Sequence, residues 1–430
     1  MKVRSSCWTA LLASAAVAGA LGMAAGAAGA ASAASSSSAA PKNFPSKELT
    51  KPLSAAQDDL AQKKYDEALT QLQQADAFAK KTPYDQHLIN HFYAYAYLGT
   101  KDMDQALKHF EAQVDDGFSE GEDKQRLLVL IAKVAYQAKN FDKAIDYGSR
   151  AITSGAADPE LGTLVGQAYY LKGDWKGTQK FEHDLVEGEI NKGATPESLQ
   201  LQLWHDACYK ANDQSCQVEA LKKLVAYYPK PEYWEELLSV LASNPAQNDR
   251  SELQLYRLML EVNVLKRANE YSDMARLARS QGSPGEAQQV LEKGFANNVF
   301  TDAAQKESNQ KALDSAKKVA AGDVASLPAL EKEAATASTG SKSVAAGYAY
   351  LGYQQYDKAA DLLSKGLAKG GLSPQDEAGA RLLLGIAQLR GGKKDDAVQT
   401  FQAVKGDPLL EQIAGLWAVH AKRPAAATSS

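Results

Sequence analysis

Apolar residues recur along most of the chain with the spacing of helices that bury one face, and they occur in paired stretches. In "LVGQAYYLKGDWKGTQKF" (Leu164 to Phe181), an apolar stretch with a small residue is followed by a short polar link and a second stretch that opens with an aromatic residue. Similar strings begin at Ala345 and Leu382. A helical period interrupted by a glycine-containing link predicts two consecutive helices. The sequence therefore predicts a helical hairpin that repeats.

The spacing of these hairpins can be measured from the small residue of each second stretch. Consecutive positions are 38, 38, 34, 42, 67, 72 and 38 residues apart, and two of these intervals are close to twice the shortest one. We therefore expect one degenerate copy in each long interval, at about 231–265 and at 301–330. Because four residues make about one helical turn, the 38-residue intervals predict lengthened helices or loops. The residues measured are Ala68, Ala106, Ala144, Thr178, Ala220, Ala287, Ala359 and Ala397.

The repeated unit resembles the tetratricopeptide repeat, a helix pair of about 34 residues. That family places bulky, small and tyrosine positions in the first helix, and aromatic, small and large apolar positions in the second. The chain departs from this pattern at Thr178, where alanine is usual, and at Lys394, where an aromatic is usual. The resemblance implies an all-α fold, a right-handed α-solenoid of stacked antiparallel helix pairs. The residues that carry it are Val165, Gly166, Tyr169 and Trp175; Ala346, Gly347, Tyr350, Tyr356, Ala359 and Leu363; Leu384, Gly385, Ala397, Phe401 and Pro408; and Trp204, Ala207, Ala220 and Leu224.

Small residues in both stretches predict where the two helices of a hairpin cross. Because interiors are close-packed, helices approach most closely where small side chains face each other. Gly166 should therefore meet Thr178, and Gly347 should meet Ala359. A single hairpin cannot bury its apolar face, so stability should come from stacking on its neighbours.

The N-terminal segment is typical of a secretory signal peptide. "MKVR" is a short positive segment, the stretch from Trp8 to about Met23 is apolar, and "ASA" at 31–33 fits a cleavage site. The stretch is too rich in glycine and alanine for a retained membrane anchor, and Cys7 precedes it, which excludes a lipoprotein attachment site. We expect an exported mature chain, periplasmic in a bacterium or secreted, without membrane insertion.

Composition and spacing together predict the domain organisation. The formal net charge is −4, loss of Lys2 and Arg4 with the leader makes it more acidic, and no basic block is present, which argues against nucleic acid as a partner. The expected segments are a signal peptide (1–33), a disordered leader (34–50), an N-terminal repeat array (51–300, with a degenerate copy at about 231–265), a degenerate helical connector (301–342), C-terminal repeats (343–420) and a disordered tail (421–430).

The sequence contains no motif that predicts an enzyme. It has no glycine-rich phosphate loop and no G-x-S-x-G string. His87 and His91 are spaced to share one helix face, but two ligands leave a tetrahedral metal site half empty. We therefore expect no catalytic residue, no cofactor and no metal site.

Two cysteines remain after export, Cys208 and Cys216. An even number in an oxidising compartment favours a disulfide. The positions of the two cysteines within their repeat copy argue against a disulfide. Cys208 stands at the small position, which should face Ala220, so Cys216 should lie about one helical turn, roughly 6 Å, along the axis from the point opposite Cys208. The sequence leaves the bridge open, and if formed it is a structural link.

If the hairpins form a solenoid, a partner should bind its concave face, which the first helices build. The resemblance implies that positions one after and four before or after the small residue point into this groove. These positions carry aromatic rings and neutral or weakly basic donors, which suit an extended peptide; an ordinary polar surface is the alternative. The predicted partner-binding residues are His91, Tyr95, Lys133, Tyr136, Gln167, Tyr170, His205, Tyr209 and Asn212.

The equivalent positions near the C-terminus are more apolar, so we expect them to be covered by the chain's own helices or by a partner. They are Tyr348, Leu351, Leu382, Ile386 and Leu389.

These observations favour a non-enzymatic scaffold or adaptor of the bacterial periplasm that binds a protein or peptide in its concave groove. The alternative is an accessory or catalytic component that acts on cell-wall or polysaccharide material, which an acidic groove with a sugar-stacking tryptophan would favour. A structural spacer without a selective partner is the third hypothesis. The fold supports many functions, so it does not decide among them.

Overall fold

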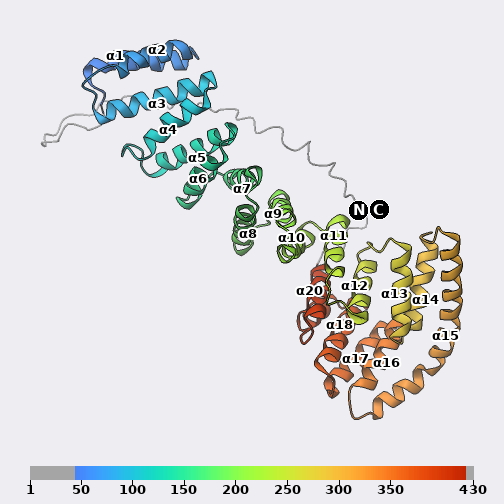
Figure 1. Ribbon diagram of the computed structural model, residues 1–430. Coiled ribbons are helices and arrows are strands. Elements are labelled where there is room, and N and C mark those ends of the chain that lie inside the picture. The colour runs from blue at the N-terminus through green and yellow to red at the C-terminus, as the bar shows by residue number, and fades with distance from the viewer. Residues whose placement is uncertain (1–43, 423–430) are drawn as a thin grey trace.

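The computed structural model describes residues 44–422, and within them all regular secondary structure is helical (Figure 1). The predicted all-α class is confirmed. The described helices are α1 (Lys47–Ala61), α2 (Tyr65–Asp76), α3 (Pro83–Thr100), α4 (Met103–Val114), α5 (Gly121–Gln137), α6 (Phe141–Thr153), α7 (Leu161–Lys172), α8 (Trp175–Asn191), α9 (Ser198–Lys210), α10 (Gln214–Tyr227), α11 (Pro231–Ala242), α12 (Asp249–Glu261), α13 (Ala268–Ser280), α14 (Pro284–Ala296), α15 (Ala303–Thr336), α16 (Ser341–Gly352), α17 (Tyr356–Lys369), α18 (Pro374–Arg390), α19 (Lys394–Gln402) and α20 (Pro408–Lys422).

Consecutive helices pack as antiparallel pairs, and each pair stacks on the next. The most extensive contacts lie within pairs such as α3 with α4, α5 with α6 and α16 with α17, and further contacts join each pair to its neighbour. The turns that close the pairs are short, and several contain a residue in the left-handed conformation, such as Lys101, Lys139 and Gly173. The predicted solenoid of stacked helix pairs is confirmed.

In the 38-residue intervals named below, the extra residues lie mainly in the first helix. Helices α3, α5 and α18, which belong to 38-residue intervals, have 18, 17 and 17 residues. Helix α7, in the single 34-residue interval, has 12 residues. The prediction of lengthened helices is confirmed, and the added length is about one turn or more.

Of the two predicted contacts between small residues, the structure has Gly347 with Ala359 but not Gly166 with Thr178. A Cβ atom added to Gly166 would lie on the carboxylate of Glu182, not on Thr178. At Gly347 it would touch both the Ala359 carbonyl and the Leu363 side chain. In both pairs the glycine therefore makes room for the large side chain that follows the small residue by one turn.

That position, four residues after the small residue, is a buried core position in every copy. Glu182 occupies it in α8, where apolar residues or glycine stand in the other copies, and it is 0% exposed. The equivalent residues are Leu72, Phe110, Gly148, Leu224, Leu291, Leu363 and Phe401.

The chain forms an extended arm followed by a rounded half that closes on itself. Figure 1 shows α1 to α10 as the arm and α11 to α20 as the rounded half, with α20 lying beside α11 and α12. Helix α20 also contacts α10 and α18. Ion pairs join distant parts of this half: Arg250 with Asp376 at 2.8 Å, and Arg390 with Glu261 at 3.0 Å.

One of the two expected degenerate copies is not a helix pair. Residues 231–265 contain two helices, α11 and α12, as expected for a degenerate copy. The stretch 301–330 instead lies within α15, a single helix of 34 residues that runs through Pro328. Its alanine-rich sequence offers no turn signal strong enough to end the helix, so the second expected copy was wrong.

The described part of the chain begins in a helix earlier than predicted. Helix α1 starts at Lys47, within the expected leader, because Leu49 is buried and the Ser46 hydroxyl donates to Asp85 at 2.5 Å. At the other end, α20 includes Ala421 and Lys422 of the expected tail. The predicted signal peptide lies outside the described residues, and among residues 44–422 no helix combines the length and apolar character needed to span a membrane.

Candidate partner-binding surface

The first helices of neighbouring pairs lie close together, as expected for the inner face of a solenoid. Helices α1 and α3, α5 and α7, and α7 and α9 contact each other directly. In the described chain, the second helices α2, α4, α6 and α8 show no comparable contact with one another. The row with the shorter separation is the concave side of a curved stack, so the predicted residues on α3, α5, α7 and α9 lie on this row.

Tyr136 and Gln167 connect two neighbouring pairs across this row. The Tyr136 hydroxyl on α5 donates to Gln167 Oε1 on α7 at 2.9 Å, and both side chains are half-buried. The structure therefore brings these two predicted residues into contact, where they fix the spacing of the helices.

Tyr170 stands at the centre of the next junction, between α7 and α9. Its hydroxyl donates to Asp206 Oδ2 at 2.5 Å and accepts from Lys210 Nζ at 2.8 Å. The Lys210 ammonium also lies 4.7 Å from the ring centres of both Tyr170 and Trp175, a cation–π arrangement. Burial and the Asp206 carboxylate raise the pKa of Tyr170. Sequence reasoning missed Asp206 and Lys210, although their spacing of four on one helix face was a signal.

His91 and Tyr95 form the beginning of the row on α3. Their ring centroids are 4.9 Å apart, and His91 Nδ1 lies 3.2 Å from Gln113 Oε1 on α4. Burial lowers the pKa of His91, so the ring is neutral at pH 7. His87 contacts Asp116 at 2.7 Å instead of sharing a site with His91. Within residues 44–422, no three or more His, Cys, Asp or Glu side chains are placed to hold a metal ion.

Lys133 is on the same row but is neutralised by the segment before α7. Its ammonium lies 2.7 Å from Asp158 and 3.5 Å from Glu160. Burial opposes its charge, but the hydrogen bond and charge of Asp158 outweigh burial and raise its pKa. Lys133 is therefore a charged group held in place by the chain itself.

The three predicted residues around the end of α9 have different environments. His205 Nε2 lies 3.3 Å from Glu236 on α11, whereas Tyr209 is 57% exposed. Asn212 is not on the helix: it occupies the turn after α9 with a φ of 54°, a left-handed conformation that asparagine tolerates. Its identity is explained by the turn, and it does not line the first-helix row.

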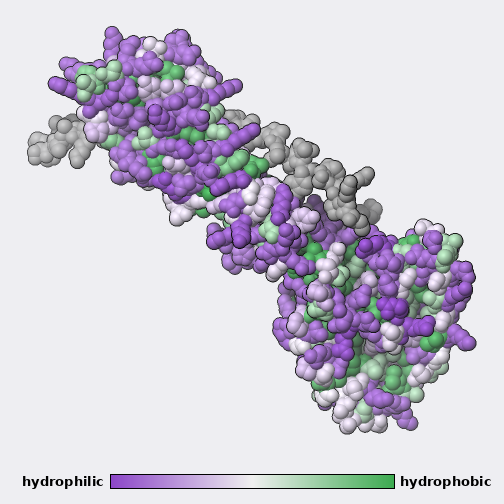
Figure 2. Space-filling model, in the orientation of Figure 1, coloured by the Kyte–Doolittle hydropathy of each residue, from purple (hydrophilic) through white to green (hydrophobic). Residues whose placement is uncertain are grey.

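The predicted side chains therefore form a row whose polar groups already have partners within the chain; they are not unpaired hydrogen-bond donors. We define the first-helix row as His91, Tyr95, Lys133, Tyr136, Gln167, Tyr170, His205 and Tyr209; its polar groups mostly contact one another or neighbouring helices, and Tyr209 is its most exposed ring. On the face shown in Figure 2, the arm is largely hydrophilic, with hydrophobic side chains in small scattered areas. A partner would contact the ring edges and alkyl chains of these residues, which contacts within the chain already hold in place.

Comparison with known families agrees with the repeated hairpins. Residues 93–159 and 344–409 match the sequence model of the tetratricopeptide repeat. These two segments of the chain are similar to tetratricopeptide repeats. The matched segments include the copies anchored at Ala106, Ala144, Ala359 and Ala397 and part of the first-helix row.

Two solved structures show how far the likeness to known folds extends. Yeast Tom70 is 11% identical, with 87% of this chain and 96% of that chain covered and a TM-score of 0.24. Naa15/Naa10 bound to HypK-THB is also 11% identical, with 83% and 68% covered and a TM-score of 0.24. No curated protein sequence matches the chain. At these scores nothing about function follows from either structure.

The apolar positions near the C-terminal end of the array of helix pairs are covered by the chain itself. Leu351, Leu382 and Ile386 are buried among the helices of the rounded half, and Tyr348 is half-buried. The sequence left open whether the chain's own helices or a partner cover these positions. In the structure, the chain's own helices cover them.

Tyr348 belongs to a buried polar cluster that sequence reasoning missed. Arg257 on α12 donates from Nε and Nη2 to the two carboxylate oxygens of Glu286 on α14, at 2.7 and 2.5 Å. Arg257 Nη2 also donates to the Tyr348 hydroxyl on α16 at 2.7 Å. Burial raises the pKa of Tyr348 to about 12. Although burial also raises the pKa of Glu286, the Arg257 charge holds it below its usual value. Together, Arg257, Glu286 and Tyr348 link helices α12, α14 and α16.

Cys208 and Cys216 form a disulfide, with their Cα atoms 5.5 Å apart. Cys208 lies two residues before the end of α9, and Cys216 lies two residues after the start of α10. The short turn therefore places them opposite each other, and the axial offset expected from the repeat phase is absent. The bridge links the two helices of one hairpin, next to Tyr209.

Reduction of this disulfide should lower the free energy of unfolding by about 2 kcal/mol, since the bridge closes a short loop. Thermal unfolding with and without reductant measures the change. The C208A/C216S variant is the control, because it should be insensitive to reductant. An identical transition of the unaltered chain in both conditions would contradict the prediction.

Proposed function

We propose that the chain is a non-catalytic scaffold or adaptor that binds a protein or peptide partner along the first-helix row of its extended arm. Tetratricopeptide repeat proteins bind protein partners, and the repeats stack into a continuous face. The observation that carries the proposal is the row itself, where rings and stems from four consecutive pairs lie on one side. Preformed, fixed side chains reduce the conformational entropy lost on binding.

We place this function in an exported compartment, periplasmic in a bacterium. The N-terminal pattern of a signal peptide supports this proposal, although it lies outside the described residues. The disulfide between Cys208 and Cys216 is consistent with it, since such bonds persist in oxidising compartments.

The polysaccharide alternative depends on a tryptophan that is free to stack on a sugar. Trp204, Trp234 and Trp417 are each at most 1% exposed. Trp175 is half-buried and lies beneath the Lys210 ammonium. None of the four offers an open ring face in an acidic groove, so the protein-binding proposal is preferred.

Photo-crosslinking from Tyr209 in the cell that exports the protein tests the proposal. A photoreactive phenylalanine analogue at Tyr209 should capture one reproducible protein, because this ring is the most exposed member of the row. The same analogue at Val319 is the matched control, since Val319 on α15 is 47% exposed and outside the row. Capture of the same proteins from both positions, or of none, would argue against a partner on this face.

A further inference from the structure

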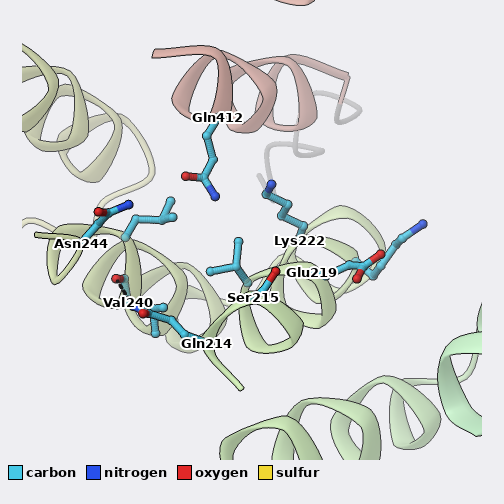
Figure 3. Close-up of a pocket in the computed structure, with 10 residues that line it drawn as sticks. Gln214, Ser215, Glu219, Lys222, Val240, Asn244 and Gln412 are labelled. Atoms are coloured by element: carbon cyan, nitrogen blue, oxygen red, sulfur yellow. Dashed lines mark hydrogen bonds between the residues drawn. The ribbon is translucent and has the colours of Figure 1, made fainter. Parts of the chain in front are cut away.

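A cavity of about 650 Å³ lies where the end of the chain packs against its middle. Figure 3 shows α10 beneath it, with Gln412 of α20 pointing into it from the opposite side and Asn244 from the segment after α11. Since α10 is the second helix of its pair, the cavity lies apart from the first-helix row. It is therefore distinct from the surface assigned above.

Four polar side chains converge on this space, as Figure 3 shows: Ser215 and Lys222 from α10, Asn244, and Gln412. Among residues 44–422, Lys222 has no hydrogen bond or ion pair, and the side chains of Ser215 and Gln412 have no hydrogen-bond partner. Asn244 Oδ1 accepts from the Ala246 N–H at 2.9 Å, which leaves its amide N–H groups free. The cavity thus presents one ammonium and three neutral donors.

The other charged residues of the cavity already have partners. Lys223 pairs with Glu187 at 2.5 Å. Glu219 also lines the cavity and lies 3.8 Å from His183; its charge acts on Lys222, but the two groups form no ion pair. Burial lowers the pKa of Lys222, and the charge of Glu219 only partly opposes this shift. An anion in the cavity would supply further negative charge.

We propose that this cavity binds a carboxylate, with Lys222 as its charged contact and Ser215, Asn244 and Gln412 as hydrogen-bond donors. Lys222 makes no ion pair within residues 44–422, so its ammonium can donate to a carboxylate, and charge-assisted hydrogen bonds are the stronger ones. The apolar side chains of Val218 and Leu241 also line the cavity. They accommodate the methylene groups of a glutamate side chain or of a small dicarboxylic acid.

Because the donors come from both sides of the α10–α20 contact, the carboxylate also links the last helix of the arm to the last helix of the rounded half. Lys222 and Ser215 lie on α10, whereas Gln412 lies on α20. A ligand that contacts both helices stabilises their closed arrangement by mass action.

Protection of Lys222 from acetylation tests this site in the full chain. The probes are glutarate and a blocked peptide of alternating glutamate and glycine, with sodium chloride at equal ionic strength and a glutamine–glycine peptide as controls. At about ten times the dissociation constant, a carboxylate probe should slow acetylation of Lys222 about tenfold. Lys176, an exposed lysine on α8, should be unaffected.

The outcomes separate the two sources of the carboxylate. Protection by both probes supports a site open to free dicarboxylates, and protection by the peptide alone supports an acidic side chain of a partner. Gln412→Ala should weaken protection, whereas Gln402→Ala, an exposed glutamine of α19, should leave it unchanged. Equal slowing of Lys222 and Lys176, equal effects of chloride, or no protection by either probe would overturn the proposal.

Discussion

Replacement of Glu182 by leucine should raise the free energy of unfolding by about 3 kcal/mol at pH 7. Glu182 is 0% exposed, and neither carboxylate oxygen has a hydrogen-bond partner. It occupies the position that Leu363 and Phe401 fill in other copies, opposite a glycine of the preceding helix. Leucine removes an unsatisfied polar group and fits a site that the repeat builds for an apolar side chain.

The gain should depend on pH in a direction that follows from the pKa of Glu182. Burial, with the nearby charges of Glu189 and Glu197, raises that pKa well above its usual value. The folded protein therefore retains a proton that the unfolded chain releases above about pH 4.5. The stability contributed by this proton is complete below that pH and is lost as the pH rises through the folded pKa. The leucine variant lacks this loss, so its advantage grows from pH 4 towards neutral pH.

Urea unfolding of both proteins at pH 4 and pH 7 measures the two effects. Glu182→Gln is the control, since it removes the charge and retains the shape but leaves a buried amide without partners. It should lose the pH dependence and gain less stability than Glu182→Leu. A leucine variant that is less stable than the original chain, or equally favoured at both pH values, would contradict this account.

The sequence was sufficient for the repeated hairpins because each is encoded locally. The small residue, the turn and the large residue one turn later all lie within about one repeat, so periodicity predicted the helix pairs and the lengthened first helices. The repeat pattern did not predict how far the two helices of a pair are shifted along each other. This offset depends on the side chains at the crossing, which is why Gly166 faces Glu182 and not Thr178.

The closure of the rounded half could not be predicted in the same way. The ion pairs of Arg250 with Asp376 and of Arg390 with Glu261 join residues 126 and 129 positions apart. Such contacts depend on the accumulated curvature of many stacked pairs, to which each copy contributes a small rotation. The 34-residue helix α15 breaks the repeat between them. For the same reason, the cavity between α10 and α20 has no counterpart in the sequence pattern.

The candidate surface was predictable in its location but not in its contacts. Repeat phase placed Tyr136, Gln167 and Tyr170 on neighbouring first helices, where the structure has them. It did not reveal that Tyr136 contacts Gln167, or that Lys210 covers Tyr170. Contacts between copies depend on rotamers and helix spacing, which a pattern within one copy does not specify. Asn212 was misplaced because a turn residue close in sequence to a helix position was assigned to that helix.

Substitution of Arg257 by alanine should destabilise the rounded half by about 4 kcal/mol, the cost typical of breaking a buried ion pair. The side chain is 2% exposed and holds both oxygens of Glu286 as well as the Tyr348 hydroxyl. Alanine would leave the Glu286 carboxylate buried and without a counter-charge between α12, α14 and α16. Hydrogen exchange of the amides in these helices measures the loss region by region.

The double variant Arg257→Met with Glu286→Leu separates the buried charge from the packing. If most of the alanine effect comes from the carboxylate left unpaired, the double variant should recover most of the lost protection, since apolar replacements of both partners are often neutral or stabilising. Exchange in α5 and α6 of the arm should be unchanged in both variants, because each repeat contacts mainly its neighbours. Equal loss in the single and double variants would instead show that Arg257 acts through the packing of its stem and its bond to Tyr348. In that case, the ion pair would not be the contact that holds α12, α14 and α16 together.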